Sequence, residues 1–255
     1  MRSTMKSTKI SQVAPIILMI TVVAQGADSV PERAQAFLSG FQGVGTHFEA
    51  NEGQLPSDAR FCFRGDGYRL DLVNKGIELR LPGNEVYLDQ AMRIRFVGAH
   101  PEPRMMGSEK LPFSVMRWET ANGTRKGLKS FSTFASVDVD EIYHDIDMRY
   151  YINQGRLEYD FILAPGADPT GIELKLDGAK KISLREDGGL QIAFPIGTIL
   201  QHKPDVYQEI EGKKAPVEAQ YAMRGERSVG FQVGNYDPSF PLVIDPVLTV
   251  RIDGH

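Results

Sequence analysis

The chain has 255 residues, with 29 lysines and arginines against 33 aspartates and glutamates, so its formal net charge is −4 at pH 7. The basic residues are scattered singly rather than gathered in a stripe, which argues against nucleic acid as a partner because a phosphate backbone requires concentrated positive charge. The length is sufficient for one large β domain, or two small ones, with a real hydrophobic core.

The N-terminus has the pattern of a secretory signal peptide. Three basic residues precede an uncharged, mostly apolar run over residues 13–24, and small residues stand before Ala27 where a signal peptidase would cleave. This run of 12 residues is shorter than the roughly 20 that cross a bilayer, so we expect no transmembrane segment after removal of residues 1–26. The sequence therefore predicts export, to the periplasm, the cell surface or the extracellular space.

Residues 27–45 predict a short helix that leads into the main body. Ser29 can cap its N-terminus and Glu32 follows three residues later, as in a capping box. Apolar side chains recur on one helical face, at Val30, Ala34, Phe37, Leu38 and Phe41. The alternative is a frayed lead-in that orders only against the rest of the protein.

From residue 46 to residue 250 the sequence reads as strand, turn, strand. The clearest example is residues 155–169, where Leu157, Tyr159 and Phe161 alternate with polar residues and a Pro/Gly turn follows. Repeated short segments of this kind, separated by Asn/Asp/Gly turns, are typical of all-β sandwiches. The sequence therefore predicts an all-β fold, with antiparallel β-sandwich architecture and one short N-terminal helix.

Residues 98–130 interrupt this rhythm with three prolines and an Asn-Gly turn. We expect an irregular connection there, and the best division of the domain, if two lobes exist, lies between residues 46–97 and residues 131–248.

Cys62 is the only cysteine, so no disulfide can form within the chain. It stands between Phe61 and Phe63, which favours a small buried hydrophobic residue over a reactive or intermolecular thiol.

Two acidic segments are candidate sites. Glu158 and Asp160 lie two residues apart on one strand face, roughly 7 Å between Cα atoms, a separation compatible with paired glycosidase carboxylates. The alternative is a solvated face whose acids pair with lysines or arginines of neighbouring strands. A second cluster could hold calcium, although Tyr143 occupies the position where a helix-loop-helix calcium site requires glycine; its members are Asp138, Asp140, Glu141, Asp145 and Asp147.

Glu49, Asn51 and Gln54 are further binding candidates, because their turn has no obvious packing role. Capping of the local backbone by these side chains is the alternative. No catalytic motif accompanies any of these residues, and calcium is the one cofactor that the sequence suggests.

Six blocks of sequence, in order, resemble one family. They are Phe48–Gln54, Arg64–Tyr68, Ile142–Tyr151, Gly155–Pro169, His202–Gln208 and Asp237–Pro246. Together they resemble the N-terminal domain of unknown function that precedes SBBP-type β-propeller repeats in secreted bacterial proteins. The resemblance implies an all-β extracellular module whose own activity is not established. It also implies that this chain, which carries no propeller repeats, is either a standalone version or a fragment.

These observations predict a non-catalytic module for binding, adhesion or assembly at the cell envelope, with a protein or a glycan of the cell surface as its partner. The alternative function is a secreted carbohydrate-active enzyme, or a calcium-dependent sugar-binding domain, that uses the acidic residues between positions 145 and 160.

Overall fold

The computed structural model describes residues 46–80, 92–121, 124–195 and 197–252. The predicted signal peptide and the predicted helix over residues 27–45 lie outside these ranges. No helix in the described ranges has the length and apolar character needed to cross a membrane.

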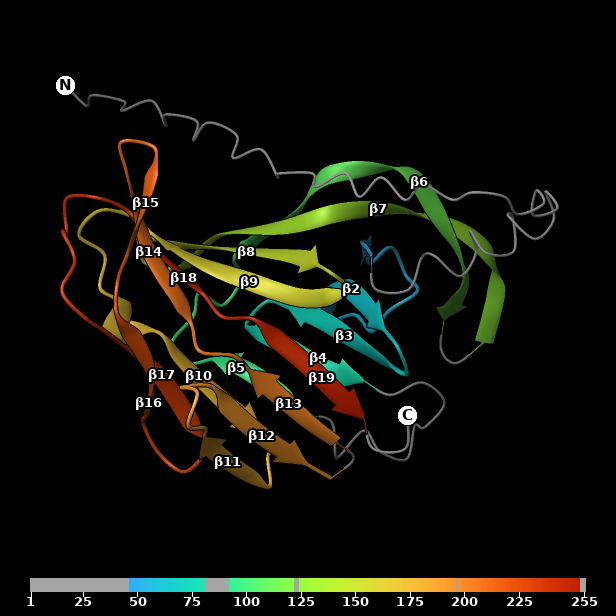
Figure 1. Ribbon diagram of the computed structural model, residues 1–255. Helices are drawn as coiled ribbons and strands as arrows, with labels where there is room; N and C mark the ends of the chain where they lie inside the picture. Colours follow the sequence, from blue (N-terminus) through green and yellow to red (C-terminus); the bar gives the residue numbers. More distant parts are fainter. Residues whose placement is uncertain (1–45, 81–91, 122–123, 196, 253–255) are drawn as a thin grey trace, which may run out of the picture. The chain divides into compact units, whose positions relative to one another are not determined.

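The regular secondary structure of the described residues is almost entirely β-strand, which confirms the predicted all-β class (Figure 1). One 3-10 turn, η2, spans Pro169–Gly171. The strands span Phe48–Ala50 (β1), Ala59–Gly65 (β2), Tyr68–Val73 (β3), Gly76–Arg80 (β4), Arg93–Phe96 (β5), Arg104–Ala121 (β6), Thr124–Tyr143 (β7), Ile146–Asn153 (β8), Arg156–Leu163 (β9), Glu173–Asp177 (β10), Lys181–Leu184 (β11), Leu190–Phe194 (β12), Gly197–Gln201 (β13), Asp205–Ile210 (β14), Lys213–Pro216 (β15), Ala219–Met223 (β16), Ser228–Val233 (β17), Leu242–Asp245 (β18) and Leu248–Ile252 (β19).

The strands form a large sheet and a small one, and neighbouring strands within both are antiparallel. The large sheet has the order β15-β14-β18-β9-β8-β7-β1-β2-β3-β4-β5-β10-β17-β16, with β6 paired to β7. The small sheet has the order β11-β12-β13-β19.

Strand β7 divides the large sheet into two layers. Along one edge β7 pairs with β6, and along the other it pairs first with β1, at Thr133 and Phe134, and then with β8 from Ser136 onward. We call β8, β9, β18, β14 and β15 layer I, and the strands from β1 to β16 in the sheet order layer II. Both layers pair with the same edge of β7, so each face of β7 contacts the core along a different part of the strand. Val137 and Val139 are buried from one face, and Phe134 packs against the core from the opposite face.

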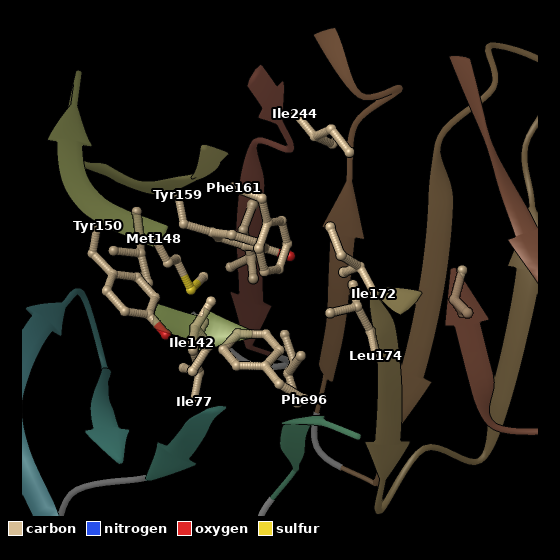
Figure 2. Packing of buried hydrophobic residues seen from close by; sticks show 14 of the residues in the cluster. Ile77, Phe96, Ile142, Met148, Tyr150, Tyr159, Phe161, Ile172, Leu174 and Ile244 are labelled. Atoms are coloured by element: carbon tan, nitrogen blue, oxygen red, sulfur yellow. The ribbon is translucent and has the colours of Figure 1, made fainter. Parts of the chain in front are cut away.

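The core lies between the two layers (Figure 2). The ring of Phe96 on β5 contacts Tyr159 and Phe161 on β9, with centroids 6.5 and 5.7 Å apart, and Phe161 contacts Phe231 on β17 at 6.0 Å. Each fully buried side chain of this size contributes roughly 1.5–3 kcal/mol to stability. This layer-on-layer packing agrees with the predicted sandwich-like architecture.

Turn chemistry fixes the register of the strands. Gln154 and Gly155 both have positive φ, 51° and 74°, as a two-residue hairpin between β8 and β9 requires. Gly76, at the start of β4, has φ 151°, and a Cβ atom there would lie 1.9 Å from the carbonyl oxygen of Ile94. Only glycine fits that position.

The expected irregular connection over residues 98–130 is instead mostly the long β6–β7 hairpin (Figure 1). Pro112 is compatible with strand β6 because β6 pairs only with β7 among the described residues, and an edge strand tolerates a missing N–H. Pro112 falls where the β6–β7 register shifts, between Lys110 and Ser114. Strands from the two expected lobes pair within one sheet, β1 with β7 and β5 with β10.

Candidate functional site

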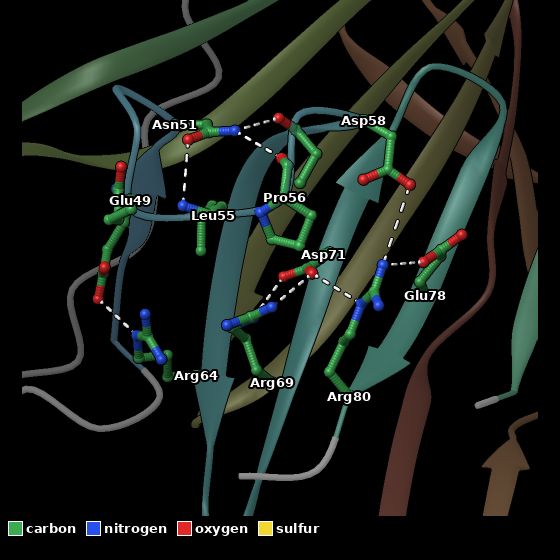
Figure 3. Close-up of polar contacts among 12 residues, drawn as sticks. Glu49, Asn51, Leu55, Pro56, Asp58, Arg64, Arg69, Asp71, Glu78 and Arg80 are labelled. Atoms are coloured by element: carbon green, nitrogen blue, oxygen red, sulfur yellow. Dashed lines mark hydrogen bonds and ion pairs between the residues drawn. The ribbon is translucent and has the colours of Figure 1, made fainter. Parts of the chain in front are cut away.

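The outer face of layer II carries buried carboxylates that are held by arginines (Figure 3). Glu49 on β1 is 1% exposed, and its Oε1 accepts from Arg117 Nη2 at 2.6 Å and from Arg64 Nε at 3.0 Å. Burial by itself would raise the pKa of Glu49, but hydrogen bonds from His47 and Arg117 and the charges of Arg64 and Arg117 lower it to about 2. Glu49 is therefore ionised and fully engaged within the protein.

Asp71 on β3 has the same arrangement. It is 0% exposed, and it accepts two hydrogen bonds from Arg69, at 2.6 and 2.8 Å, and one from Arg80 at 3.1 Å. Arg80 also donates to Glu78 at 2.5 Å, and Arg93 Nε lies 3.0 Å from the same carboxylate. We call Glu49, Asp71, Glu78 and their arginines the clasped face.

Asn51 and Gln54 bond the backbone of their own loop. Asn51 Nδ2 donates to the carbonyl oxygens of Pro56 and Ala59, at 2.8 and 2.7 Å (Figure 3), and Gln54 Nε2 donates to that of Ala50 at 2.6 Å. These contacts are the backbone capping that stands as the alternative to a binding role.

Cys62 lies in a small apolar cluster with Leu55 and Ala59, on strand β2 and the loop before it. Its thiol is completely buried, as the flanking phenylalanines indicate. Burial, and next the charge of Glu49, raise its pKa to about 12, so the thiol stays protonated.

The outer face of layer I carries a different set of carboxylates. The β9–β18 register pairs Ile244 with Phe161 and Val247 with Glu158, which places Asp245 directly opposite Asp160. Asp205 on β14 is in turn opposite Asp245. Three aspartates thus form a cross-strand row over β9, β18 and β14, and Glu158 lies beside it. We call Glu158, Asp160, Asp205 and Asp245 the open carboxylates.

These open carboxylates have no cationic partner in the described part of the chain: no lysine, arginine or histidine nitrogen lies within 4.0 Å of Glu158, Asp160 or Asp245. Glu158 is nevertheless only 4% exposed. The contacts here are neutral, from Tyr151 Oη to Asp160 Oδ1 at 3.1 Å and from Asn153 Nδ2 to Glu158 Oε2 at 3.3 Å. Like charges opposite one another on paired strands are destabilising.

This setting changes the acidity of two groups. Burial, and next the charge of Asp245, raise the pKa of Asp160 to about 7. Burial, and next the charge of Glu158, raise the pKa of Asp245 to about 6. Asp245 Oδ1 is buried and has no hydrogen-bond partner in the part of the chain that the structure describes. Both carboxyl groups therefore change their protonation state close to neutral pH.

The nearest cations are held by other groups. Arg149, the cross-strand neighbour of Asp160, donates to Asp138 at 2.6 and 3.2 Å. The Lys214 ammonium on β15 lies 3.7 Å from the centroid of the Tyr207 ring on β14. Within the described ranges, the open carboxylates therefore lack a direct donor of opposite charge.

The calcium candidates do not come together. Asp138 pairs with Arg149, Asp140 lies 3.5 Å from Arg104, Asp145 lies 3.5 Å from His144, and Asp147 Oδ1 accepts from the backbone N–H of Glu141 at 2.8 Å. In the ranges that the structure describes, no three histidine, cysteine, aspartate or glutamate side chains are grouped so as to hold a metal ion.

Of the sequence candidates, Glu158 and Asp160 fall within the open carboxylates, but Tyr151, Asp205 and Asp245 were not identified from the sequence. The alternation of β18, with Leu242 and Ile244 buried, would place Asp245 outward. No local pattern shows that β18 pairs with β9.

Fold and site together define an all-β, sandwich-like module with one clasped and one open acidic face. The chain belongs to the family described as Domain of unknown function (DUF7948), which matches residues 48–247. No curated protein and no solved structure matches the chain.

Proposed function

We propose that this chain is an exported module that binds a partner at the cell envelope, similar to the domain that precedes SBBP-type propeller repeats, and that it carries out no catalysis of its own. The observation that carries the proposal is the set of open carboxylates. Burial of an acid without a cation is costly, and a protein that retains several such acids on one face commonly uses them. The signal-peptide pattern of residues 1–26 supports export.

The arrangement on β9 favours binding over hydrolysis. Glycosidase carboxylates flank the bond that they cleave, one on each side of the sugar. Glu158 and Asp160 are neighbours on the same face of one strand, and Asp245 lies opposite Asp160 in the same plane. All three therefore approach a bound molecule from one side, which suits charge recognition.

A secreted carbohydrate-active enzyme is the second candidate, because a carboxyl group with a pKa of about 7, as at Asp160, is what a general acid requires. The test separates the two. Purified chain is incubated with sedimented cell envelopes and with soluble polysaccharides, using Asp160→Asn, Asp245→Asn and the exposed control Asp187→Asn.

Binding predicts that both site variants lose envelope association, that the control keeps it, and that no reducing sugar is released. Release of sugar that Asp160→Asn abolishes would establish the enzyme instead. Equal sedimentation of all variants would overturn the assignment of binding to this face.

Export is tested separately. Cells expressing the chain with its own N-terminus are fractionated, and the protein is analysed by mass spectrometry. We expect a mature form beginning at Ala27 outside the cytoplasm. An uncleaved chain retained in the cytoplasm would contradict the proposal.

A further inference from the structure

In the described part of the chain, the outer face of layer I carries a further unpaired hydrogen-bonding group besides the open carboxylates. Strand register places Ser136 opposite Tyr151, and Tyr151 opposite Glu158, so these three side chains form a second cross-strand row beside the aspartates. Ser136 is 3% exposed. Neither its Oγ nor Asp245 Oδ1 has a hydrogen-bond partner among the described residues. Buried polar atoms rarely remain unpaired, and here they accompany carboxylates that lack cations. The face therefore has the chemistry to accept hydrogen bonds from a donor outside the protein.

An ammonium group already lies at the border of this face. Lys214 Nζ is 3.7 Å from the centroid of the Tyr207 ring, and Tyr207 is one strand away from β18, opposite Val243. The charges of Asp205 and Asp245 both act on Lys214. The ammonium contacts the aromatic ring rather than forming an ion pair within 4.0 Å of a carboxylate. Aromatic ring and carboxylates together are a known environment for alkylammonium groups.

The spacing of the acceptors disfavours a metal ion. Calcium requires six to eight oxygens converging at about 2.3–2.6 Å, and no such grouping occurs in the described part of the chain. An alkylammonium has three N–H donors and no acceptor, so it complements carboxylates on two neighbouring strands, Asp160 on β9 and Asp245 on β18.

We infer that the open carboxylates bind an alkylammonium group, carried by a free diamine or by a lysine side chain, with Asp160 and Asp245 as the charged acceptors and Tyr151 as the neutral partner. The inference rests on the proposed binding function and names its ligand chemistry. Lys214 acts as an internal competitor for the same acceptors.

Binding of this kind depends on pH in a defined direction. The ammonium pairs with ionised carboxylates, whereas protons compete for Asp160 and Asp245 near neutral pH. Alkylamines stay protonated up to about pH 10, so affinity rises as pH increases from 5 to 8. The charged and titratable groups that face these two aspartates are Glu158, Tyr151, Arg149, Asp205, Tyr207 and Lys214.

Isothermal titration calorimetry with 1,5-diaminopentane, and separately with an N-acetylated peptide containing one lysine, tests the inference at pH 8 and low salt. We expect binding of at least one probe, weaker by about tenfold or more in Asp160→Asn and in Asp245→Asn because each loses a charge-assisted hydrogen bond. Asp187→Asn, at an exposed acid paired with Arg185, should bind as the wild type does. The diamine alone would identify a free amine, and the peptide alone a lysine of a partner protein.

Lys214→Met should strengthen binding, and the wild-type affinity should fall from pH 8 to pH 5. These two measurements keep the inference testable if an aspartate variant does not fold. Absence of binding by the wild-type chain, or an unchanged wild-type affinity in both asparagine variants, would overturn it. Envelope association without amine binding would overturn this inference and leave the proposed function standing.

Discussion

The clasped and the open faces both carry buried carboxylates, but only the clasped face pairs them with arginines. On layer II, Glu49 and Asp71 each accept hydrogen bonds from two arginines. On layer I, Asp160 and Asp245 face each other with no cation within 4.0 Å among the described residues. One pKa is lowered, that of Glu49 to about 2, and another is raised, that of Asp160 to about 7. Burial therefore does not decide the role of an acid; the supply of positive charge does.

The largest expected effect is on the clasped face. Asp71→Asn leaves Arg69 and Arg80 without their carboxylate, and loss of one partner of a buried ion pair typically costs about 3–5 kcal/mol. We expect a large fall in the free energy of unfolding, measured by urea titration. Asp187→Asn serves as the exposed control. A loss below about 1 kcal/mol would show that the arginines find other partners and that the clasp is not structural.

On the open face the same substitution should act in the opposite direction. Asp160→Asn removes a charge that faces Asp245 and Glu158, and its amide oxygen can still accept from Tyr151. We expect stability at pH 8 to be unchanged or to rise by about 1 kcal/mol. The measurement is urea unfolding at pH 8. Destabilisation comparable to that of Asp71→Asn would erase the distinction between the two faces.

The pH dependence of stability distinguishes the two faces in the intact protein. Glu49 has a folded pKa of about 2, below its unfolded value near 4.3, so its contribution is present above pH 4 and is lost as pH falls toward 2. Asp160 has a folded pKa of about 7, above its unfolded value near 3.9, so stability is greatest below pH 4 and falls as pH rises toward 7.

Tm measured from pH 2 to pH 8 checks both signs. The difference in Tm between wild type and Glu49→Gln should change mainly between pH 4 and pH 2. For Asp160→Asn it should change mainly between pH 4 and pH 7. Coincident pH ranges for the two variants would refute the assignment of opposite pKa shifts.

The sequence predicted strands well where side chains alternate and a turn follows. Strand β9, Arg156–Leu163, lies within the predicted strand-and-turn segment 155–169, and its hairpin with β8 follows from Gln154 and Gly155. The β6–β7 hairpin was missed because prolines ordinarily interrupt strands, and an edge strand removes that penalty. The short β1 was also missed, since its three residues carry too little pattern.

The site was predicted less completely than the fold. Glu158 and Asp160 could be identified because alternation places them on one outer face. Asp245 becomes their neighbour through a strand pairing of residues far apart in sequence, and no periodicity contains that information. The difference between the clasped and open faces depends on where arginine side chains end, as in Arg149, which bonds Asp138 rather than the opposite Asp160. The amino-acid composition does not show which of two nearby carboxylates an arginine bonds.

The smallest effect concerns Cys62, which lies on layer II at the cross-strand position between Glu49 and Asp71. Its thiol is buried and its pKa is raised to about 12, so a thiol reagent should label the native protein only when that region opens. Labelling of the wild type at pH 8, followed by mass spectrometry, should therefore be slow. Glu49→Gln should label faster because the clasp beside Cys62 is weakened, whereas Asp160→Asn should label at the wild-type rate. If both variants label equally fast, opening at Cys62 is global, and the two faces are coupled through the core rather than independent.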